Sequence, residues 1–240
     1  MITMQKDNLL KLWKKFQQQM ASEELNNILE RGICYPRIED AHRILVTGMN
    51  PSFRQGDIAC KENICTYDYQ KIVEGREDRY FLGFDKLFPA TYKQEVAYMD
   101  LLNFRETNQQ IVWKFCNDIK GLELVTENLR LNQVFMEQVI RPRFIMVKNK
   151  GSWCFWGKKA KTNSNIWMGY CFKHLEFLPC GELCRITGLT AHTDRVSYNE
   201  LPETNLKGTI VLFTSHFQYQ ASDKLPTPEL IARLCKMIEK

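Results

Sequence analysis

The sequence lacks the features that mark several common classes of protein. No run of about 18 apolar residues occurs in the 240-residue chain, which argues against a membrane-spanning helix. The first 15 residues are polar and amphipathic and have no apolar core of the signal-peptide type, so we expect a cytoplasmic protein. Neither a Gly-x-Gly-x-x-Gly motif nor a Gly-x-Ser-x-Gly motif occurs, which argues against a dinucleotide-binding Rossmann site and a serine hydrolase.

The nine cysteines do not form a recognisable metal-binding pattern. The only close pairs are Cys60 with Cys65 and Cys180 with Cys184, and neither is a Cys-x-x-Cys motif. No histidine lies at a companion zinc spacing. We therefore expect free thiols in a reducing compartment, no metal ion and no other cofactor.

Acidic residues are absent from positions 138–175, and this part of the chain contains eight Lys and Arg residues. This basic segment, residues 141–173, therefore carries a charge of +8. The whole chain has a net charge of +5, so the remaining residues together carry −3 and the positive excess lies in the segment. The segment is also rich in Trp, Tyr and Phe. Basic side chains contact phosphates and aromatic rings stack on bases, so the segment is a candidate nucleic-acid-binding surface. The alternative is a solvated lysine face beside aromatic residues of the core. The candidate phosphate contacts are Lys148, Lys150, Lys158, Lys159 and Lys161.

Short apolar runs alternate with segments of helical periodicity along the chain. The runs at 44–48, 96–102, 144–148 and 209–214 predict strands of one mainly parallel sheet, and 168–177 with 183–189 predict a hairpin. Helical segments between them predict a three-layer α/β/α domain over residues 1–240, with residues 1–40 as an N-terminal helical extension. Thr107 is a candidate helix N-cap, and Thr227-Pro228-Glu229 indicates the start of a last helix. Residues 49–78 show no clear period and predict a long loop.

Polar and aromatic residues follow each of the four predicted parallel strands. In open α/β sheets, ligands bind beyond the carboxyl ends of the strands. The segments at these ends are 48–53, 100–105, 148–153 and 214–219. Each also has a structural explanation: Gly48 could serve a turn, for example, and His216 could be a partly buried imidazole. Four such ends on one chain favour a common cleft.

These strand ends resemble motifs of the uracil-DNA glycosylase superfamily. Residues 48–52, Gly-Met-Asn-Pro-Ser, resemble its first motif, in which the mismatch-specific and single-strand-selective branches carry Gly-x-Asn-Pro. Residues 101–103, Leu-Leu-Asn, look like the strand whose Asn reads the uracil edge, and residues 150–151 are similar to the end of its third strand. Residues 214–216, Thr-Ser-His, stand where the superfamily has its second motif. The resemblance follows the element order over residues 40–239.

The resemblance implies DNA repair by base excision, with hydrolysis of the N-glycosidic bond of uracil or another damaged base. Asn50 would orient the attacking water without removing its proton, so the reaction would be slower than with an Asp. His216 would donate a hydrogen bond to the departing base. Phe217 and Gln218 follow His216 where the superfamily has Pro and Ser, so insertion into duplex DNA would rely on Phe217 or Tyr219 as an apolar wedge.

Four further residues are candidates for holding the base. The backbone N–H of Met49 could stabilise the base anion, and Phe53 could stack on an extruded base. Asn103 could form two hydrogen bonds with one base edge. Asp100 is the alternative residue for reading the base edge. Residues three apart on a strand face opposite sides, so only one of Asp100 and Asn103 should enter the pocket.

Two alternatives to a monofunctional DNA glycosylase remain. One is a catalytically weak or inactive nucleic-acid-binding protein on the same fold. The other is a different α/β hydrolase or nucleotide-processing enzyme. For the glycosylase and for the binding protein, the expected partner is single- or double-stranded DNA. We also expect a monomer that does not engage a membrane.

Overall fold

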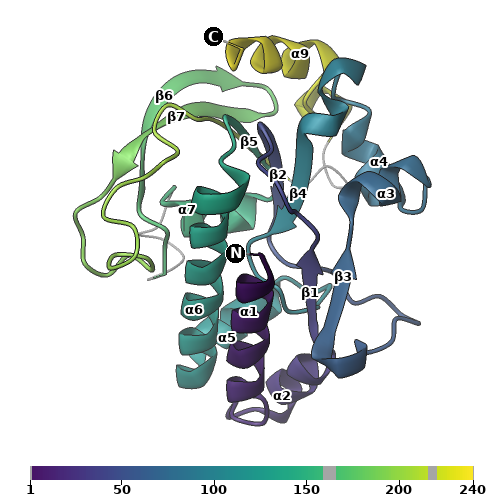
Figure 1. Ribbon diagram of the computed structural model, residues 1–240, viewed down its shortest axis with the longest axis vertical. Helices are drawn as coiled ribbons and strands as arrows, with labels where there is room; N and C mark the ends of the chain where they lie inside the picture. Colours follow the sequence, from purple (N-terminus) through teal and green to yellow (C-terminus); the bar gives the residue numbers. More distant parts are fainter. Residues whose placement is uncertain (1, 159–165, 216–220, 240) are drawn as a thin grey trace.

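A six-stranded sheet with the strand order β4-β2-β5-β8-β7-β6 forms the centre of the molecule (Figure 1). The computed structural model describes residues 2–158, 166–215 and 221–239. Neighbouring strands from β4 to β8 are parallel, whereas the hairpin of β7 and β6 is antiparallel and joins the sheet beside β8. The predicted α/β class with a mainly parallel sheet is therefore confirmed. The strands are β2 Ile44–Gly48, β4 Val96–Asp100, β5 Phe144–Val147, β6 Tyr170–Leu178, β7 Gly181–Leu189 and β8 Ile210–Thr214.

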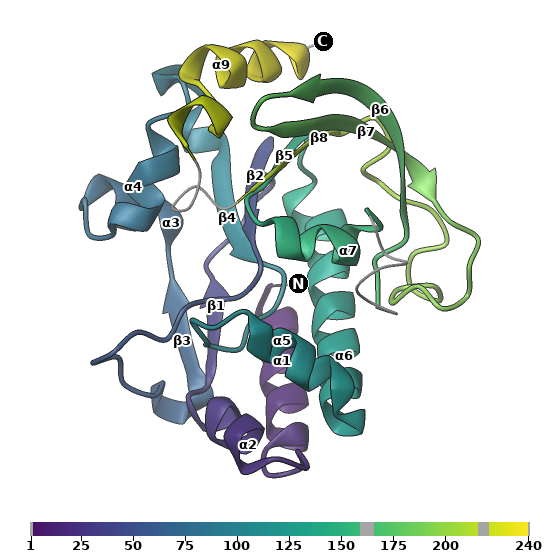
Figure 2. The same cartoon turned by 180° about the vertical axis from the view of Figure 1, so that it is seen from behind.

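Helices cover both faces of the parallel strands, as Figures 1 and 2 show. Every residue of β2, β4, β5 and β8 is buried, as expected for parallel strands packed on two sides. Leu45 belongs to one apolar core and its neighbour Val46 to the other, because successive side chains point to opposite faces. One core includes residues of α1 (Ile2–Phe16), α2 (Glu23–Glu30), α5 (Gln110–Asn117), α6 (Ile119–Phe135) and α7 (Trp153–Trp156); the other includes residues of α3 (Tyr69–Glu74), α4 (Arg79–Asp85) and α9 (Pro228–Met237).

Side-chain caps fix the starts of several helices. The Thr227 hydroxyl accepts a hydrogen bond from the Leu230 N–H, with Pro228 in the first turn of α9, as the sequence predicts. Thr107 is not an N-cap, because α5 begins only at Gln110 and the Thr107 hydroxyl instead donates to the Phe53 carbonyl at 2.7 Å.

No helix in the described part of the chain is long and apolar enough to cross a membrane.

A second, two-stranded parallel sheet was not expected from the sequence. It pairs β1 (Ile33–Pro36) with β3 (Ile64–Tyr67). The predicted loop over residues 49–78 therefore contains a strand and α3, and the predicted helical extension over residues 1–40 contains β1. β3 is only half-buried along its length, so it lacks the apolar run that identifies the central strands.

One pair of cysteines is oxidised, contrary to the expectation of free thiols. Cys60 and Cys65 form a disulfide that closes a short loop before β3. The other seven cysteines are free, and only Cys171 among them is exposed. Cys60 is buried and Cys65 lies in β3 of the small sheet, so the disulfide fixes the end of the loop that follows β2.

Candidate functional site

The four parallel strands bring their carboxyl ends to one edge of the sheet. Gly48 at the end of β2 is level with Asp100 of β4, and Thr47 is level with Val147 of β5, which in turn is level with Phe213 of β8. The segments that the sequence singles out therefore start side by side. His216, Phe217, Gln218, Tyr219, Lys159 and Lys161 lie outside the described residues.

The side chain of Asn50 is held in one orientation by its amide nitrogen. Nδ2 donates to the carbonyl oxygens of Glu106, at 2.6 Å, and Pro51, at 3.1 Å. The carboxamide oxygen, Oδ1, is buried and has no hydrogen-bond partner among the described residues. Because both donors of the amide face carbonyls, the oxygen is left to accept a hydrogen bond from a water or a ligand. Asn50 therefore offers an unused acceptor, which a water molecule reaches only if the surrounding chain moves, because the oxygen has almost no surface accessible to solvent.

Gly48 leaves room for a buried carboxylate beneath the Asn50 segment. A Cβ at this position would lie 2.1 Å from Oδ1 of Asp100 and 2.4 Å from the Tyr98 hydroxyl. The Tyr98 hydroxyl donates to the same Oδ1 at 2.8 Å, and the Tyr80 hydroxyl lies 3.1 Å from that of Tyr98. Burial raises the pKa of Asp100 to about 7, against the opposing effects of the Tyr98 hydrogen bond and the Lys148 charge.

Lys148 is buried at the end of β5, not on the surface where a phosphate contact was expected. The residue is 2 % exposed, and its Nζ lies 3.8 Å from the centre of the Tyr80 ring and 4.2 Å from that of Phe84. Burial lowers its pKa to about 7, although the Asp100 and Asp78 carboxylates favour the charged form. The prediction of a surface phosphate contact at Lys148 is therefore corrected: the ammonium group lies against aromatic rings.

Asn103 is engaged inside the protein. It is 1 % exposed, and its Oδ1 accepts hydrogen bonds from the side chains of Asn128, at 2.7 Å, and Asn132, at 2.8 Å. Its Nδ2 donates to the Cys34 carbonyl at 2.8 Å. These contacts fasten the end of β4 to α6 and β1, and they use the donor and the acceptor that a base edge would need.

Two arginines that no sequence pattern indicates lie against the ring of Phe53. The guanidinium carbon of Arg31 is 4.6 Å from the centre of the ring, and that of Arg105 is 4.9 Å away. Arg31 pairs with Glu106 at 2.7 Å, and Arg105 with Asp57 at 3.5 Å. Three separate segments contribute to this cluster, so no sequence spacing indicates it.

Met49 supports the same segment from inside. Its side chain is buried, and its carbonyl accepts from the Leu102 N–H at 2.9 Å. The methyl group approaches Gly151, where an added Cβ would lie 2.8 Å away, so Gly151 allows the two strand ends to pack closely.

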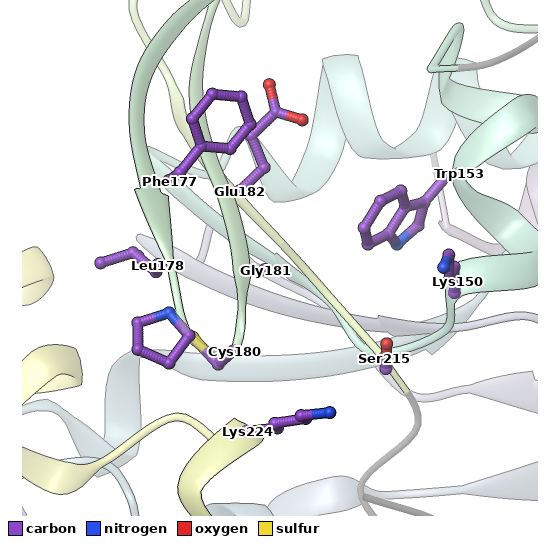
Figure 3. A pocket seen from close by; sticks show the side chains of 10 residues that line it. Lys150, Trp153, Phe177, Leu178, Cys180, Gly181, Glu182, Ser215 and Lys224 are labelled. Atoms are coloured by element: carbon purple, nitrogen blue, oxygen red, sulfur yellow. The ribbon is translucent and has the colours of Figure 1, made fainter.

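A hollow of about 380 Å³ lies beside the ends of β5 and β8, below the β6–β7 hairpin (Figure 3). Trp153 and Phe177 flank it from different elements; the Trp153 indole donates to the Thr214 carbonyl at 3.2 Å, whereas Phe177 is 78 % exposed. Lys150 and Lys224, both exposed, also line it. We call this the lysine–aromatic hollow. Its lining is completed by Leu178, Pro179, Cys180, Gly181, Glu182 and Ser215.

Lys158 is tied to the hairpin. Its Nζ is 2.7 Å from Oε1 of Glu182, and both side chains are largely buried. Its charge is therefore balanced by Glu182 within the protein, and its predicted phosphate contact stays a prediction. Of the predicted phosphate contacts that lie in the described part of the chain, Lys150 alone has an exposed side chain.

Comparisons of the chain with protein-family models, with curated proteins and with solved structures found no match. The motif resemblance at the strand ends and the geometry of those ends are therefore the basis for inferring a function.

Proposed function

We propose that this protein is a DNA base-excision glycosylase that hydrolyses the N-glycosidic bond of uracil or another damaged base. The single observation that carries the proposal is the Asn50 carboxamide, whose nitrogen is held by two carbonyls while its buried oxygen is left to accept. It lies in a Gly-Met-Asn-Pro-Ser segment at the carboxyl edge of a parallel sheet, where ligands of such folds bind.

The chemistry requires a positioned water and a partner for the departing base. Cleavage develops positive charge on the sugar and negative charge on the base. Asn50 orients the water but cannot take its proton, so its contribution is positional. His216, by its place in the sequence, supplies the hydrogen bond to the base anion. Phe53 offers a stacking surface. The guanidinium groups of Arg31 and Arg105 lie near its ring, and each is paired with a carboxylate.

The lysine–aromatic hollow offers a place for the nucleic-acid strand next to these ends. Lys150 and Lys224 present ammonium groups, and Phe177 presents an exposed ring. Trp153 is mostly buried and forms part of the wall. This combination suits a single strand, whose phosphates pair with lysines while its bases stack.

The test is a panel of single-stranded oligonucleotides that carry uracil, hypoxanthine, xanthine or hydroxymethyluracil, assayed for abasic sites. We expect the wild-type protein to leave abasic sites at the damaged base. The rate should be lower by about a hundredfold in Asn50→Ala, because water positioning is lost. Ser52→Ala is the matched control, since Ser52 is exposed on the same segment. Equal rates in the two variants would contradict the role of Asn50.

A binding protein without catalysis is the second candidate. It is favoured by Asn103, because the amide that would read the base edge is engaged within the protein rather than presented to a ligand. A protein that retains the oligonucleotides but leaves no abasic site on any base of the panel would replace the enzyme by this alternative.

A further inference from the structure

Three side chains of the types that ligate metals lie on one face of the β6–β7 hairpin. His174 of β6 is the Cα partner of Cys184 of β7. Glu182 is two residues before Cys184 and therefore points to the same face of the strand. The register of the hairpin thus brings an imidazole, a carboxylate and a thiol together from positions whose spacing in the sequence matches no zinc motif.

The distances between these groups are close to those of a zinc coordination shell. Oε1 of Glu182 lies 3.1 Å from Nδ1 of His174 and 3.3 Å from Sγ of Cys184. The three ligand atoms all lie within 4.8 Å of one another. For a tetrahedral zinc ion with ordinary bond lengths, the corresponding O···N and O···S separations are about 3.4 and about 3.6 Å. Small side-chain adjustments would therefore complete three corners of the tetrahedron.

A positive group already contacts two members of this cluster. Nζ of Lys158 is 2.7 Å from Oε1 of Glu182 and 3.7 Å from Sγ of Cys184. Glu182 thus accepts from three groups at one oxygen atom. The ammonium group shows that the cluster favours a cation at this point, and it identifies the side chain that a metal ion would displace.

We propose that His174, Glu182 and Cys184 form a binding site for Zn²⁺ or a similar divalent transition metal. On binding, the Cys184 thiol releases its proton to solvent and Lys158 moves out to solvent. The carboxylate and the thiolate together neutralise the two charges of the ion, neutral His174 supplies the nitrogen ligand, and water completes the tetrahedron. This mixed set of N, O and S ligands favours zinc over Mg²⁺ or Ca²⁺, which prefer oxygen. The site does not depend on the proposed glycosylase activity.

Cobalt(II) is a suitable probe because its thiolate complexes absorb light and zinc displaces it. We expect one equivalent of Co²⁺ to give a sulfur-to-cobalt charge-transfer band that zinc abolishes. Cys184→Ser should remove the band, and His174→Ala should weaken Co²⁺ affinity by about tenfold or more. The matched controls are Cys171→Ser, an exposed thiol on the same hairpin, and His192→Ala, an exposed imidazole outside it.

The Lys158→Met variant tests whether Lys158 competes with the metal ion or merely lies near the three ligands. The variant removes the resident cation and leaves all three ligands in place, so Co²⁺ should bind about tenfold more tightly. Absence of the charge-transfer band in the wild-type and Lys158→Met proteins, its survival in Cys184→Ser, or equal losses in His174→Ala and His192→Ala would overturn the proposal.

Discussion

Gly48 and Asp100 constrain each other at the start of the candidate site. The motif resemblance explains Gly48 by function, whereas the structure shows a packing reason: the space of a Cβ is taken by Oδ1 of Asp100 and the Tyr98 hydroxyl. The two explanations are compatible, because the buried carboxylate lies directly beneath the segment that carries Asn50.

Gly48→Ala should lower the free energy of unfolding by about 1–3 kcal/mol, because the new methyl group overpacks the site. Chemical denaturation measures this change. Gly83→Ala is the matched control: a Cβ at Gly83 meets no atom within 4 Å, and α4 should gain up to about 1 kcal/mol from the better helix former. If both variants changed stability by the same amount, the close contact at Gly48 would have no energetic consequence.

Asp100 should also make stability depend on pH. Its pKa is raised from 3.8 to about 7, so the folded chain keeps a proton that the unfolded chain releases at lower pH. The contribution of Asp100 is therefore most favourable below pH 4 and is lost as the pH rises to about 7, by on the order of 4 kcal/mol at most. Asp100→Asn should remove this loss while retaining an acceptor for Tyr98. Denaturant unfolding of both proteins between about pH 4 and pH 7 tests this, and parallel curves would refute it.

Among the elements, the disulfide loop before β3 connects the small sheet to the candidate site. Cys60 lies next to Arg105, whose Nη1 is 3.4 Å from the Cys60 sulfur and donates to the Ile58 carbonyl at 2.8 Å. Arg105 also approaches the Phe53 ring. The disulfide therefore helps to hold the segment that carries Phe53.

Replacing both cysteines, Cys60→Ser with Cys65→Ser, should lower the free energy of unfolding by about 2 kcal/mol, because the covalent loop is short. Treating the wild-type protein with dithiothreitol should cause a similar loss, and the double variant should not respond to the reductant. If dithiothreitol also destabilised the double variant, the loss of stability would come from another part of the chain.

The central strands could be predicted from the sequence, whereas the site could be predicted only in part. Ile44, Phe144 and Ile210 begin apolar runs that match β2, β5 and β8, since burial on both faces leaves a continuous hydrophobic signal. β1 and β3 were not predicted, because both strands are short and β3 is half-exposed. The position of Asn50 at a strand end was predictable.

The partners of individual side chains could not be predicted, because they depend on tertiary contacts. Nothing local indicates that Asn103 faces α6 or that Lys148 lies against Tyr80 and Phe84. The same limit applies to His174 and Cys184, which meet only through the register of the hairpin.

For the whole molecule, the charge distribution predicts how nucleic-acid binding depends on salt. If Lys150 and Lys224 each contact a phosphate, replacing both with Gln should reduce the slope of log affinity against log salt concentration by about 1.4 for a single strand. Lys14→Gln is the control, because Lys14 is exposed on α1. Fluorescence anisotropy with a labelled oligonucleotide at several salt concentrations measures the slope. An unchanged slope in the double variant would place the phosphate contacts elsewhere.

The position of β8 in the sheet has a consequence for how the chain folds during synthesis. β8 pairs with β5 on one side and β7 on the other, although it follows both in the sequence. A growing chain can form the β6–β7 hairpin early, but the hairpin has no docking strand until residues 210–214 have emerged. Pairings of such long sequence separation form slowly and leave strand edges exposed meanwhile. Release of the chain just before β8 would therefore leave the β6–β7 hairpin unattached to the parallel strands, a state prone to aggregation.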